Sequence, residues 1–402
     1  MITDTMSKEI RKNTDPETGK GNVLYVIPYP RFFSQHKNVG GHVAHAYGIT
    51  SELAAAGYRV HIILEEEISL IKGKGRMVTP VPLKNNTIVN RILWGKKLIN
   101  EIEEAVKTAP PLFCYMRYSV GFQNWLPALK KALGDIPLIL EVNSFGSQRR
   151  RWMSFYEGFF LDYADHLIVI SEPVYKAFHK FFGEKITGKT IVVPNGVDPD
   201  RFMNWESNIS RECGEVLKAG YAGMIESWYG LDDVIEGFLK VSQNNKFTSR
   251  LELHFYGEGP YRKKLENKYR NVENIVFHGA KPFEEMPEII GELDILINSD
   301  SLQKSYGSPT KMFEYMSSGR PILSARTAQS EKLLDNGKFG WFYELGNPDS
   351  FAKAMDHLIQ NFNQAKDKAK EARKHVEKNH TWKQRLNYIF VNFDLPVDQQ
   401  VK

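Results

Sequence analysis

Short apolar stretches alternate with longer segments of helical periodicity along most of the chain. The stretches are rich in β-branched and aromatic residues, which is typical of strands that are buried on both faces between crossover helices. In the first half they are Val23 to Ile27, Arg59 to Leu64, Leu112 to Met116, Leu138 to Val142, His166 to Ile170 and Thr190 to Val193. In the second half they are Lys218 to Gly223, Leu251 to Tyr256, Asn274 to Phe277, Asp294 to Ile297, Pro321 to Ser324 and Gly340 to Tyr343. Two such series predict two doubly wound α/β sheets.

A run of turn residues separates the two series. The stretch Pro194-Asn195-Gly196-Val197-Asp198-Pro199 stops any regular element, and the polar segment Asn204 to Glu215 precedes the next strand. We therefore place the domain junction there. The predicted divisions are a flexible segment over residues 1–21, a first domain over 22–197, a second domain over 198–377 and a C-terminal part over 378–402.

Length, charge and cysteine content narrow the class of protein. A chain of 402 residues exceeds what one compact core accommodates. The net charge of +5 is too mild for a dedicated nucleic-acid-binding protein, so we expect no nucleic-acid partner. Only Cys114 and Cys213 are present, and they can build neither a disulfide framework nor a Cys-based zinc site. These features, with no signal-peptide pattern in the first 20 residues, predict a cytoplasmic protein. No stretch approaches the roughly 18 apolar residues of a membrane span, so any membrane contact is expected to be peripheral.

Two adjacent glycines follow the first predicted strand. Gly40 and Gly41 open a segment with helical spacing. Glycines at a helix start let a ligand approach the backbone, and the free N–H groups there favour a phosphate. An ordinary βα turn explains the same residues more simply, and the spacing differs from the G-x-G-x-x-G of dinucleotide folds. His42 and His45 have no obvious third ligand nearby, so we expect surface or hydrogen-bonded histidines rather than a metal site.

Polar residues stand at the ends of two predicted strands of the first domain. Glu141 and Asn143 end one strand, and Arg117 ends the strand before it. The carboxyl ends of parallel strands line the crevice in which open α/β sheets bind ligands. Capping of the next helix explains Asn143 equally well. The basic run Arg149 to Arg151 is usually a solvated helix face and sometimes meets phosphates or anionic lipid.

The sharpest pattern lies between residues 306 and 321. Ser308 and Pro309 open a predicted helix, and Lys311 and Glu314 lie on one face of it because they are three residues apart. A nucleotide sugar needs a cation and backbone donors for its diphosphate, and a carboxylate for its ribose hydroxyls. Lys311 and Glu314 supply that combination, although they could also simply pair with each other.

Five motifs in this order resemble the family 4 glycosyltransferases, which are retaining, nucleotide-sugar-dependent enzymes of the GT-B fold. The resemblance covers about residues 22–395. Its motifs are Gly40-Gly41, Val192 to Asp198 at the interdomain crossing, Gly223 with Trp228 to Asp232, Gly257-Glu258-Gly259-Pro260, and Ser308-Pro309-Thr310-Lys311 with Glu314-Tyr315-Met316 and Gly319.

The resemblance implies two Rossmann-like domains that face a cleft, with the final helix returning to the N-terminal domain. It implies that the first domain binds a saccharide, lipid-linked or other hydroxyl acceptor and the second the nucleotide-sugar donor. The implied donor-binding residues are Gly40, Gly41, Gly223, Gly257, Glu258, Ser308, Pro309, Thr310, Lys311 and Glu314. Catalytic contributions are expected from Glu314, Lys311, Glu141 and Asn143, and acceptor contacts from His42, Arg117 and Arg149. The family's front-face transfer with retention needs no protein nucleophile, metal or other cofactor.

Two positions depart from the family pattern. Many relatives carry two glutamates eight residues apart, but here Tyr306 stands in place of the one that precedes Glu314, as in relatives with the Ser-Pro-x-Lys motif. After the first strand of the second domain, many relatives place an Arg and a Lys on the diphosphate, whereas this chain has Met224 and Tyr229. Lys311 is the candidate replacement for these cations.

Other functions stay open at this point. A non-catalytic nucleotide-sugar-binding subunit and a GT-B sugar-nucleotide epimerase are the alternatives to a transferase. A role in cell-surface polysaccharide or glycolipid synthesis is a hypothesis. The segment Ile88 to Lys107 is predicted to have an apolar side, with Lys96 and Lys97 nearby. The apolar residues on that side are Ile88, Ile92, Ile99, Ile102 and Val106. A core-packed helix explains this pattern, and so does peripheral contact with an anionic membrane at the inner face of the cell membrane.

Overall fold

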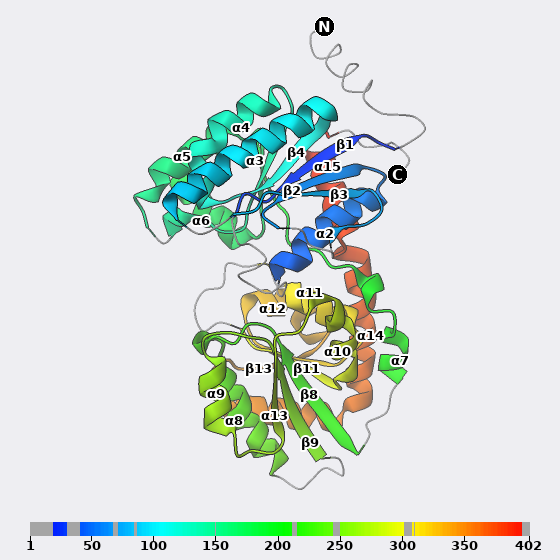
Figure 1. Cartoon of the computed structure of the whole chain (residues 1–402). Coiled ribbons are helices and arrows are strands. Elements are labelled where there is room, and N and C mark those ends of the chain that lie inside the picture. The colour runs from blue at the N-terminus through cyan, green and yellow to red at the C-terminus, as the bar shows by residue number, and fades with distance from the viewer. Residues whose placement is uncertain are drawn as a thin grey trace.

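Two parallel sheets form the centres of two α/β lobes (Figure 1). The computed structural model describes residues 19–29, 41–66, 71–83, 87–148, 150–210, 215–243, 250–300, 308 and 310–395. Within these residues the N-terminal lobe has a seven-stranded sheet in the order β3-β2-β1-β4-β5-β6-β7. The C-terminal lobe has a six-stranded sheet in the order β10-β9-β8-β11-β12-β13. The two doubly wound sheets expected from the sequence are confirmed.

The strands of the N-terminal lobe are β1 (Asn22–Val26), β2 (Arg59–Leu64), β3 (Arg76–Pro80), β4 (Pro111–Arg117), β5 (Leu138–Val142), β6 (His166–Val169) and β7 (Thr190–Val192). Those of the C-terminal lobe are β8 (Val216–Ala222), β9 (Arg250–Tyr256), β10 (Ile275–Gly279), β11 (Ile295–Asn298), β12 (Ile322–Ala325) and β13 (Trp341–Tyr343). The pattern of apolar runs missed β3, because this edge strand has no buried residue and its apolar run is only Met77-Val78, between Arg76 and Thr79.

Helices cover both faces of the N-terminal sheet. They are α2 (Gly41–Ala55), α3 (Ile88–Thr108), α4 (Leu126–Leu133), α5 (Met153–Tyr163), α6 (Glu172–Phe182) and the C-terminal α15 (Trp382–Asn392). Alternate strand residues face opposite cores, so Leu24 packs with α3 to α6 while Tyr25 packs with α2 and α15. The chain thus returns to the N-terminal lobe in its last helix, as expected (Figure 1).

The returning helix approaches α2 closely. Thr381 and Gln384 form a capping box at the start of α15, with the Thr381 side chain accepting from the Gln384 backbone N–H at 3.2 Å. A Cβ atom at Gly48 of α2 would lie 2.0 Å from Nε1 of Trp382. The glycine therefore gives the indole the room it needs to pack between the two helices.

The C-terminal sheet is also covered on both faces. Its helices are α8 (Leu231–Ser242), α9 (Arg262–Tyr269), α10 (Met286–Glu292), α11 (Thr310–Ser317), α12 (Ala328–Leu333), α13 (Pro348–Gln360) and α14 (Phe362–Asn379), and the short α7 (Trp205–Ser210) packs on α14. Residues of α8 and α13 share one core and residues of α11 and α14 the other. Short 3-10 helices are η4 (Val120–Trp125), η5 (Gly146–Gln148), η6 (Gly183–Lys185), η7 (Pro199–Arg201), η8 (Ser227–Tyr229), η9 (Phe283–Glu285) and η10 (Asp335–Gly337).

Two chain segments cross between the lobes and pair with each other. The backbone N–H of Val197 donates to the carbonyl of His380 at 2.9 Å, and the N–H of Trp382 donates to the carbonyl of Val197 at 3.2 Å. The last strand of the first sheet ends at Val192 and the first strand of the second begins at Val216. The segment predicted to be flexible, residues 1–21, lies almost entirely outside the described residues.

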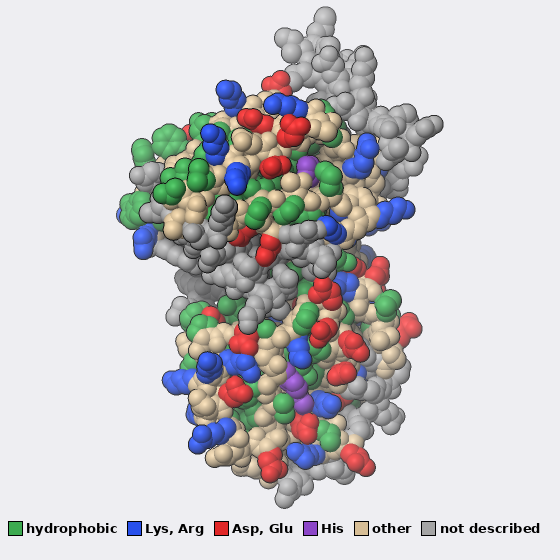
Figure 2. All heavy atoms as spheres, in the orientation of Figure 1, with side chains coloured by type: hydrophobic (Ala, Val, Ile, Leu, Met, Phe, Trp, Pro, Cys, Tyr) green, Lys and Arg blue, Asp and Glu red, His purple; other side chains and the backbone are tan. Residues whose placement is uncertain are grey.

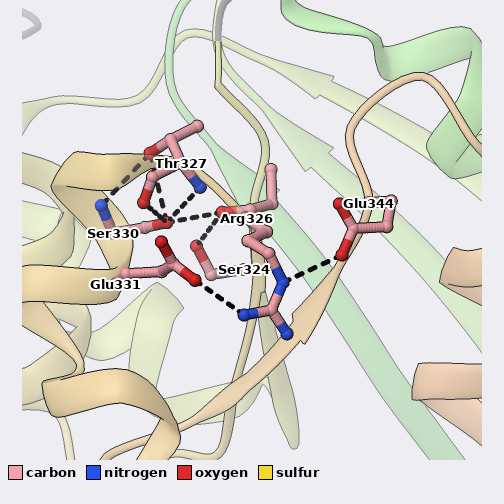
Figure 3. Close-up of polar contacts among 7 residues, drawn as sticks. Ser324, Arg326, Thr327, Ser330, Glu331 and Glu344 are labelled. Atoms are coloured by element: carbon pink, nitrogen blue, oxygen red, sulfur yellow. Dashed lines mark hydrogen bonds and ion pairs between the residues drawn. The ribbon is translucent and has the colours of Figure 1, made fainter.

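Side-chain capping fixes the turn between β12 and α12 (Figure 3). Oγ1 of Thr327 accepts from the backbone N–H of Ser330 at 3.1 Å, and Oγ of Ser330 accepts from that of Thr327 at 2.9 Å. Arg326, next in the chain, pairs with Glu331 at 2.7 Å and with Glu344 at 2.8 Å. Because these ion pairs face solvent, the capping box is the larger stabilising contribution at this turn.

Candidate active site at the junction of the lobes

A buried lysine lies near the start of α11. Nζ of Lys311 donates to the carbonyl of Ser299 at 3.3 Å and lies 4.4 Å from the centre of the Tyr221 ring. Burial lowers the pKa of Lys311 to about 8, and the charge of Asp300 opposes this shift. Among the described residues no carboxylate forms an ion pair with it. Lys311 is therefore a cation at neutral pH that is available to an anion.

The carboxylate of Glu314 lies one turn further along α11. Burial raises the pKa of Glu314 to about 7, and Arg201 opposes that shift. The nearest guanidinium nitrogen of Arg201 is 3.9 Å from the carboxylate, beyond hydrogen-bond length, so both oxygens keep their capacity to accept. Arg201 itself donates to the carbonyl of Phe283 at 2.6 Å and lies 3.5 Å above that ring. The alternative in which Lys311 simply pairs with Glu314 is not found among the described residues, and Arg201 is the cation beside Glu314.

Sequence reasoning missed Arg201. The residue belongs to η7, directly after the crossing segment, and it precedes Glu314 by more than a hundred residues. The signal that could have found it is its place in Asp198-Pro199-Asp200-Arg201, a turn next to the domain junction.

The loops after β8 and β9 touch each other beside Lys311. Gly257 has φ of +149°, and a Cβ atom there would lie 1.8 Å from the carbonyl oxygen of Gly223. A Cβ atom on Gly223 would in turn lie 3.6 Å from Cδ of Lys311. Two of the predicted donor-site glycines thus let the backbones meet next to the lysine. Glu258 is different, because its side chain is 47% exposed and pairs with Arg262 at 2.6 Å.

Two helices begin at the same place, one from each lobe. A Cβ atom on Gly41, the first residue of α2, would lie 3.4 Å from Oγ1 of Thr310, the first residue of α11. The N–H of Asn195 donates to Oγ of Ser308 at 2.8 Å, and its side-chain amide donates to Oγ1 of Thr310 at 2.8 Å. Both helix N-termini carry partial positive charge, so their meeting point favours an anion. Gly40, Tyr306 and Pro309 lie outside the described residues.

A second polar group lies under α2 in the N-terminal lobe. The carboxylate of Glu141 in β5 accepts from Nε2 of His45 at 2.8 Å and from the hydroxyl of Tyr115 at 2.5 Å. Burial alone would raise the pKa of Glu141, but His45, Arg117 and Tyr115 together hold it well below its usual range. Burial lowers the pKa of His45, against the attraction of Glu141, so His45 is a neutral donor at neutral pH. The expectation of a hydrogen-bonded His45 is confirmed.

Three polar atoms near this group lack a partner. Oε1 of Glu141, Nδ1 of His45 and Oδ1 of Asn143 are buried and have no hydrogen-bond partner within the described chain. Because an unsatisfied buried polar atom costs stability, such atoms mark a place for a ligand or water. The side chains of His42 and Arg149 lie outside the described residues, while Arg117 is half-buried at the end of β4.

Neither a membrane span nor a metal cluster is found in the described part of the chain. Every described helix is too short or too polar to cross a bilayer. This statement covers residues 19–29, 41–66, 71–83, 87–148, 150–210, 215–243, 250–300, 308 and 310–395. Over the same ranges no three His, Cys, Asp or Glu side chains come together as metal ligands would.

Curated relatives of the chain are weakly similar glycosyltransferases. An uncharacterized glycosyltransferase of Methanocaldococcus jannaschii is 24% identical over 224 residues, which are 55% of this chain and 56% of the relative. The alignment thus spans little more than half the length of that relative. A second uncharacterized glycosyltransferase of the same organism is 23% identical over 335 residues, covering 80% of this chain and 86% of the relative.

Solved structures share the fold at low sequence identity. HepE from Anabaena, determined in complex with UDP and glucose, superimposes with a TM-score of 0.68 at 13% identity, covering 93% of this chain and 100% of that one. Sucrose-phosphate synthase from Thermosynechococcus elongatus gives a TM-score of 0.70 at 14% identity, covering 93% and 98%. At these identities the likeness shows the fold.

Two family models match the two lobes in turn. The model of Glycosyltransferase Family 4 matches residues 39–201, and the model of Glycosyl transferases group 1 matches residues 217–361. Together the two matched regions span most of the chain, one on each sheet. The chain therefore belongs to the family 4 glycosyltransferases, which are built on the GT-B fold.

Proposed function

We propose that the protein is a retaining glycosyltransferase that moves a sugar from a nucleotide-diphosphate sugar to a hydroxyl acceptor. One observation carries the proposal: the N-termini of α2 and α11 meet beside Lys311, a buried cation that has no ion pair within the described chain. A diphosphate is the anion that fits this arrangement, since it presents several oxygens to a cation and to backbone N–H groups. HepE, which shares the fold, was determined with UDP and with UDP-glucose.

Each side chain of the site has a role in this proposal. Lys311 and the N–H groups at the two helix starts hold the diphosphate, and they stabilise the negative charge that grows there as the glycosidic bond breaks. Glu314 accepts hydrogen bonds from the paired ribose hydroxyls, for which its two oxygens are available. The departing phosphate oxygen takes the proton of the acceptor hydroxyl, so transfer with retention needs no protein nucleophile. We propose no metal or other cofactor.

The N-terminal lobe supplies the acceptor side of the proposed reaction. Oε1 of Glu141 and Oδ1 of Asn143 accept from hydroxyls of the transferred sugar or of the acceptor, which satisfies two buried atoms. His45 and Tyr115 hold the Glu141 carboxylate in place for this contact. His42, Arg117 and Arg149 stay candidates for acceptor contacts. The proposed acceptor is a saccharide or a lipid-linked hydroxyl in cell-surface polysaccharide or glycolipid synthesis, reached from the cytoplasm.

A donor panel tests the proposal. UDP-, GDP- and ADP-sugars are offered with candidate acceptors, nucleotide release is measured, and the anomeric configuration of the product is read by NMR. Lys311→Met should weaken donor binding roughly 10- to 100-fold, because a charge-assisted hydrogen bond contributes about 1.5–3 kcal/mol. The matched control Lys263→Met changes an exposed lysine of α9 and should leave binding unchanged.

The outcomes separate the proposal from its alternatives. If the folded protein binds no donor, the transferase reading fails. Donor binding without turnover, in the wild type and in Glu314→Ala alike, would instead indicate a non-catalytic nucleotide-sugar-binding subunit. Conversion of the donor to an epimer without any acceptor would indicate a sugar-nucleotide epimerase.

A further inference from the structure

Large apolar side chains gather on the outer surface of α3 and α5. Thirteen such side chains are exposed within the described residues, and six of them belong to the start of α3 or to α5 and the residue before it. We call these six the apolar patch: Val89, Ile92, Leu93, Trp152, Phe155 and Phe159, each more than half exposed. Clusters of this kind on an otherwise polar surface mark interaction sites.

The apolar patch is not needed for the core beneath it. On the inner side of α3, Trp94, Leu98, Ile99 and Ile102 pack against the sheet. Ile92 is exposed while Ile99 and Ile102 are buried, although the spacing predicts all three for one side of the helix. One side of α3 therefore belongs to the core, and further apolar residues near its start are exposed.

The two helices meet through η4. This short helix packs against both α3 and α5. A Cβ atom on Gly95 of α3 would lie 2.2 Å from Nε1 of Trp125 in η4, so the contact is close. On α5 the rings of Phe155 and Phe159 lie 5.3 Å apart, edge to face. Figure 2 shows hydrophobic side chains at the left of the N-terminal lobe, where Figure 1 places α5 and the start of α3.

Basic side chains border the apolar patch. On α3 the exposed face continues from Ile92 and Leu93 to Lys96 and Lys97 one turn later, and all four are exposed. Arg150 and Arg151, just before Trp152, are also exposed. These four basic residues we call the basic border.

Exposed acidic side chains lie further along both helices, as Glu101 on α3 and Asp162 on α5 do. The first turns of α3 and α5 contain no acidic residue. Glu157, within α5, is buried and accepts from the backbone N–H groups of Gly146 and Ser147 at 2.6 and 2.8 Å. The combination of aromatic and aliphatic side chains with the basic border is complementary to an anionic lipid surface.

We propose that this face docks the N-terminal lobe on an anionic bilayer. The apolar patch enters the headgroup region, and the basic border lies on the lipid phosphates. Since α5 follows the loop that begins at Asn143, docking would bring the carboxyl edge of the sheet, and thus the junction of the lobes, close to the membrane. The inference goes beyond the proposed function, because binding to a bilayer does not require sugar transfer.

Vesicle co-sedimentation of the full chain tests the docking. Binding is measured on phosphatidylcholine vesicles with and without phosphatidylglycerol, at low and high salt. We expect binding only with the anionic lipid and its loss at high salt, because the attraction of surface charges is screened. Lys96→Gln with Lys97→Gln should reduce partitioning about fivefold for each charge removed. Phe155→Ser with Phe159→Ser should reduce it at least as strongly.

Matched controls keep the test specific. Lys263→Gln with Lys264→Gln removes the same charge from α9, and Val391→Ser removes an apolar side chain that is 78% exposed on α15. Both should bind as the wild type does. A thermal shift with UDP, unchanged in every variant, shows that the fold and the donor site are intact, so that loss of docking and loss of the proposed function are told apart.

Three results would overturn the inference. The first is that the wild type fails to bind anionic vesicles, and the second is that the patch variants bind as well as the controls. The third is a concentration-dependent self-association that Phe155→Ser abolishes in the absence of lipid. That result would show that a second copy of the chain, rather than a bilayer, covers the apolar patch.

Discussion

Replacing Glu314 by glutamine should stabilise the ligand-free protein at pH 8 while weakening its binding of a nucleotide sugar. The side chain is 15% exposed, and its burial raises its pKa to about 7 from an ordinary 4.5. At pH 8 the folded chain therefore holds an ionised carboxylate in an environment that disfavours the charge. Glutamine keeps the shape and loses the ionisation, so this cost disappears.

The magnitude and its pH dependence follow from the shift. A difference of about 2.5 pKa units corresponds to about 3 kcal/mol, and this already includes the attraction of Arg201, which opposes the shift. Because the folded-state pKa is raised, the folded chain binds the proton more tightly than the unfolded chain. The wild type thus loses stability as the pH rises from about 4.5 to about 7, and the loss is complete above pH 7. The advantage of Glu314→Gln should be near zero at pH 4.5 and full at pH 8.

Thermal unfolding of both proteins at pH 5 and pH 8 measures the effect. We expect the midpoint of the variant to exceed that of the wild type by several degrees at pH 8 and by little at pH 5. Glu288→Gln, which removes an exposed carboxylate of α10, is the matched control. Its free energy of unfolding should stay within about 0.5 kcal/mol of the wild-type value at both pH 5 and pH 8. A variant less stable than the wild type at pH 8, or a difference that does not depend on pH, would refute the reasoning.

Two further predictions concern the site and the returning helix. If Glu314 must be ionised and Lys311 charged to bind the donor, kcat/KM should rise with a pKa near 7 and fall with one near 8, and Lys311→Arg should remove the falling limb because arginine stays charged. Initial rates of nucleotide release across pH check this, and a flat profile would contradict it. Gly48→Ala should destabilise the chain by about 1–3 kcal/mol, since its Cβ would lie 2.0 Å from Nε1 of Trp382. Gly158→Ala, whose Cβ would meet nothing within 4 Å on α5, should stabilise it by about 0.5–1 kcal/mol. Equal melting temperatures for these two variants would mean that α15 does not pack on α2 as described.

The sequence predicted the fold well because its central strands are buried on both faces. All five residues of β5 are buried, and such strands read as continuous apolar runs. The exposed edge strand β3 lacks that signal and was missed. The structure divides the C-terminal helical segment into α13 and α14 at Asn361, which ends α13. A single asparagine is a weak indication that a helix ends, because the segment around it is rich in the helix-forming residues Lys and Ala.

The candidate site was predictable only where its residues are close in sequence. Lys311 and Glu314 share a helix, so their spacing alone places them on one face. Arg201 reaches Glu314 from the crossing segment, and no pattern within either segment shows that the two are neighbours in space. The same holds for Asn195, which reads as a turn residue but donates to Ser308 and Thr310 from the other lobe.

Positive charges gathered at the junction of the lobes destabilise the ligand-free protein. Two helix N-termini, each with partial positive charge, point at one place where Lys311 is already buried without an ion pair in the described chain. The hydrogen bonds of Asn195 to Ser308 and Thr310 offset part of this repulsion but add no negative charge. Groups of like charge that lower stability are typical of functional sites, where a ligand of opposite charge binds. An anion bound there would offset the repulsion at the same few residues that join the two lobes.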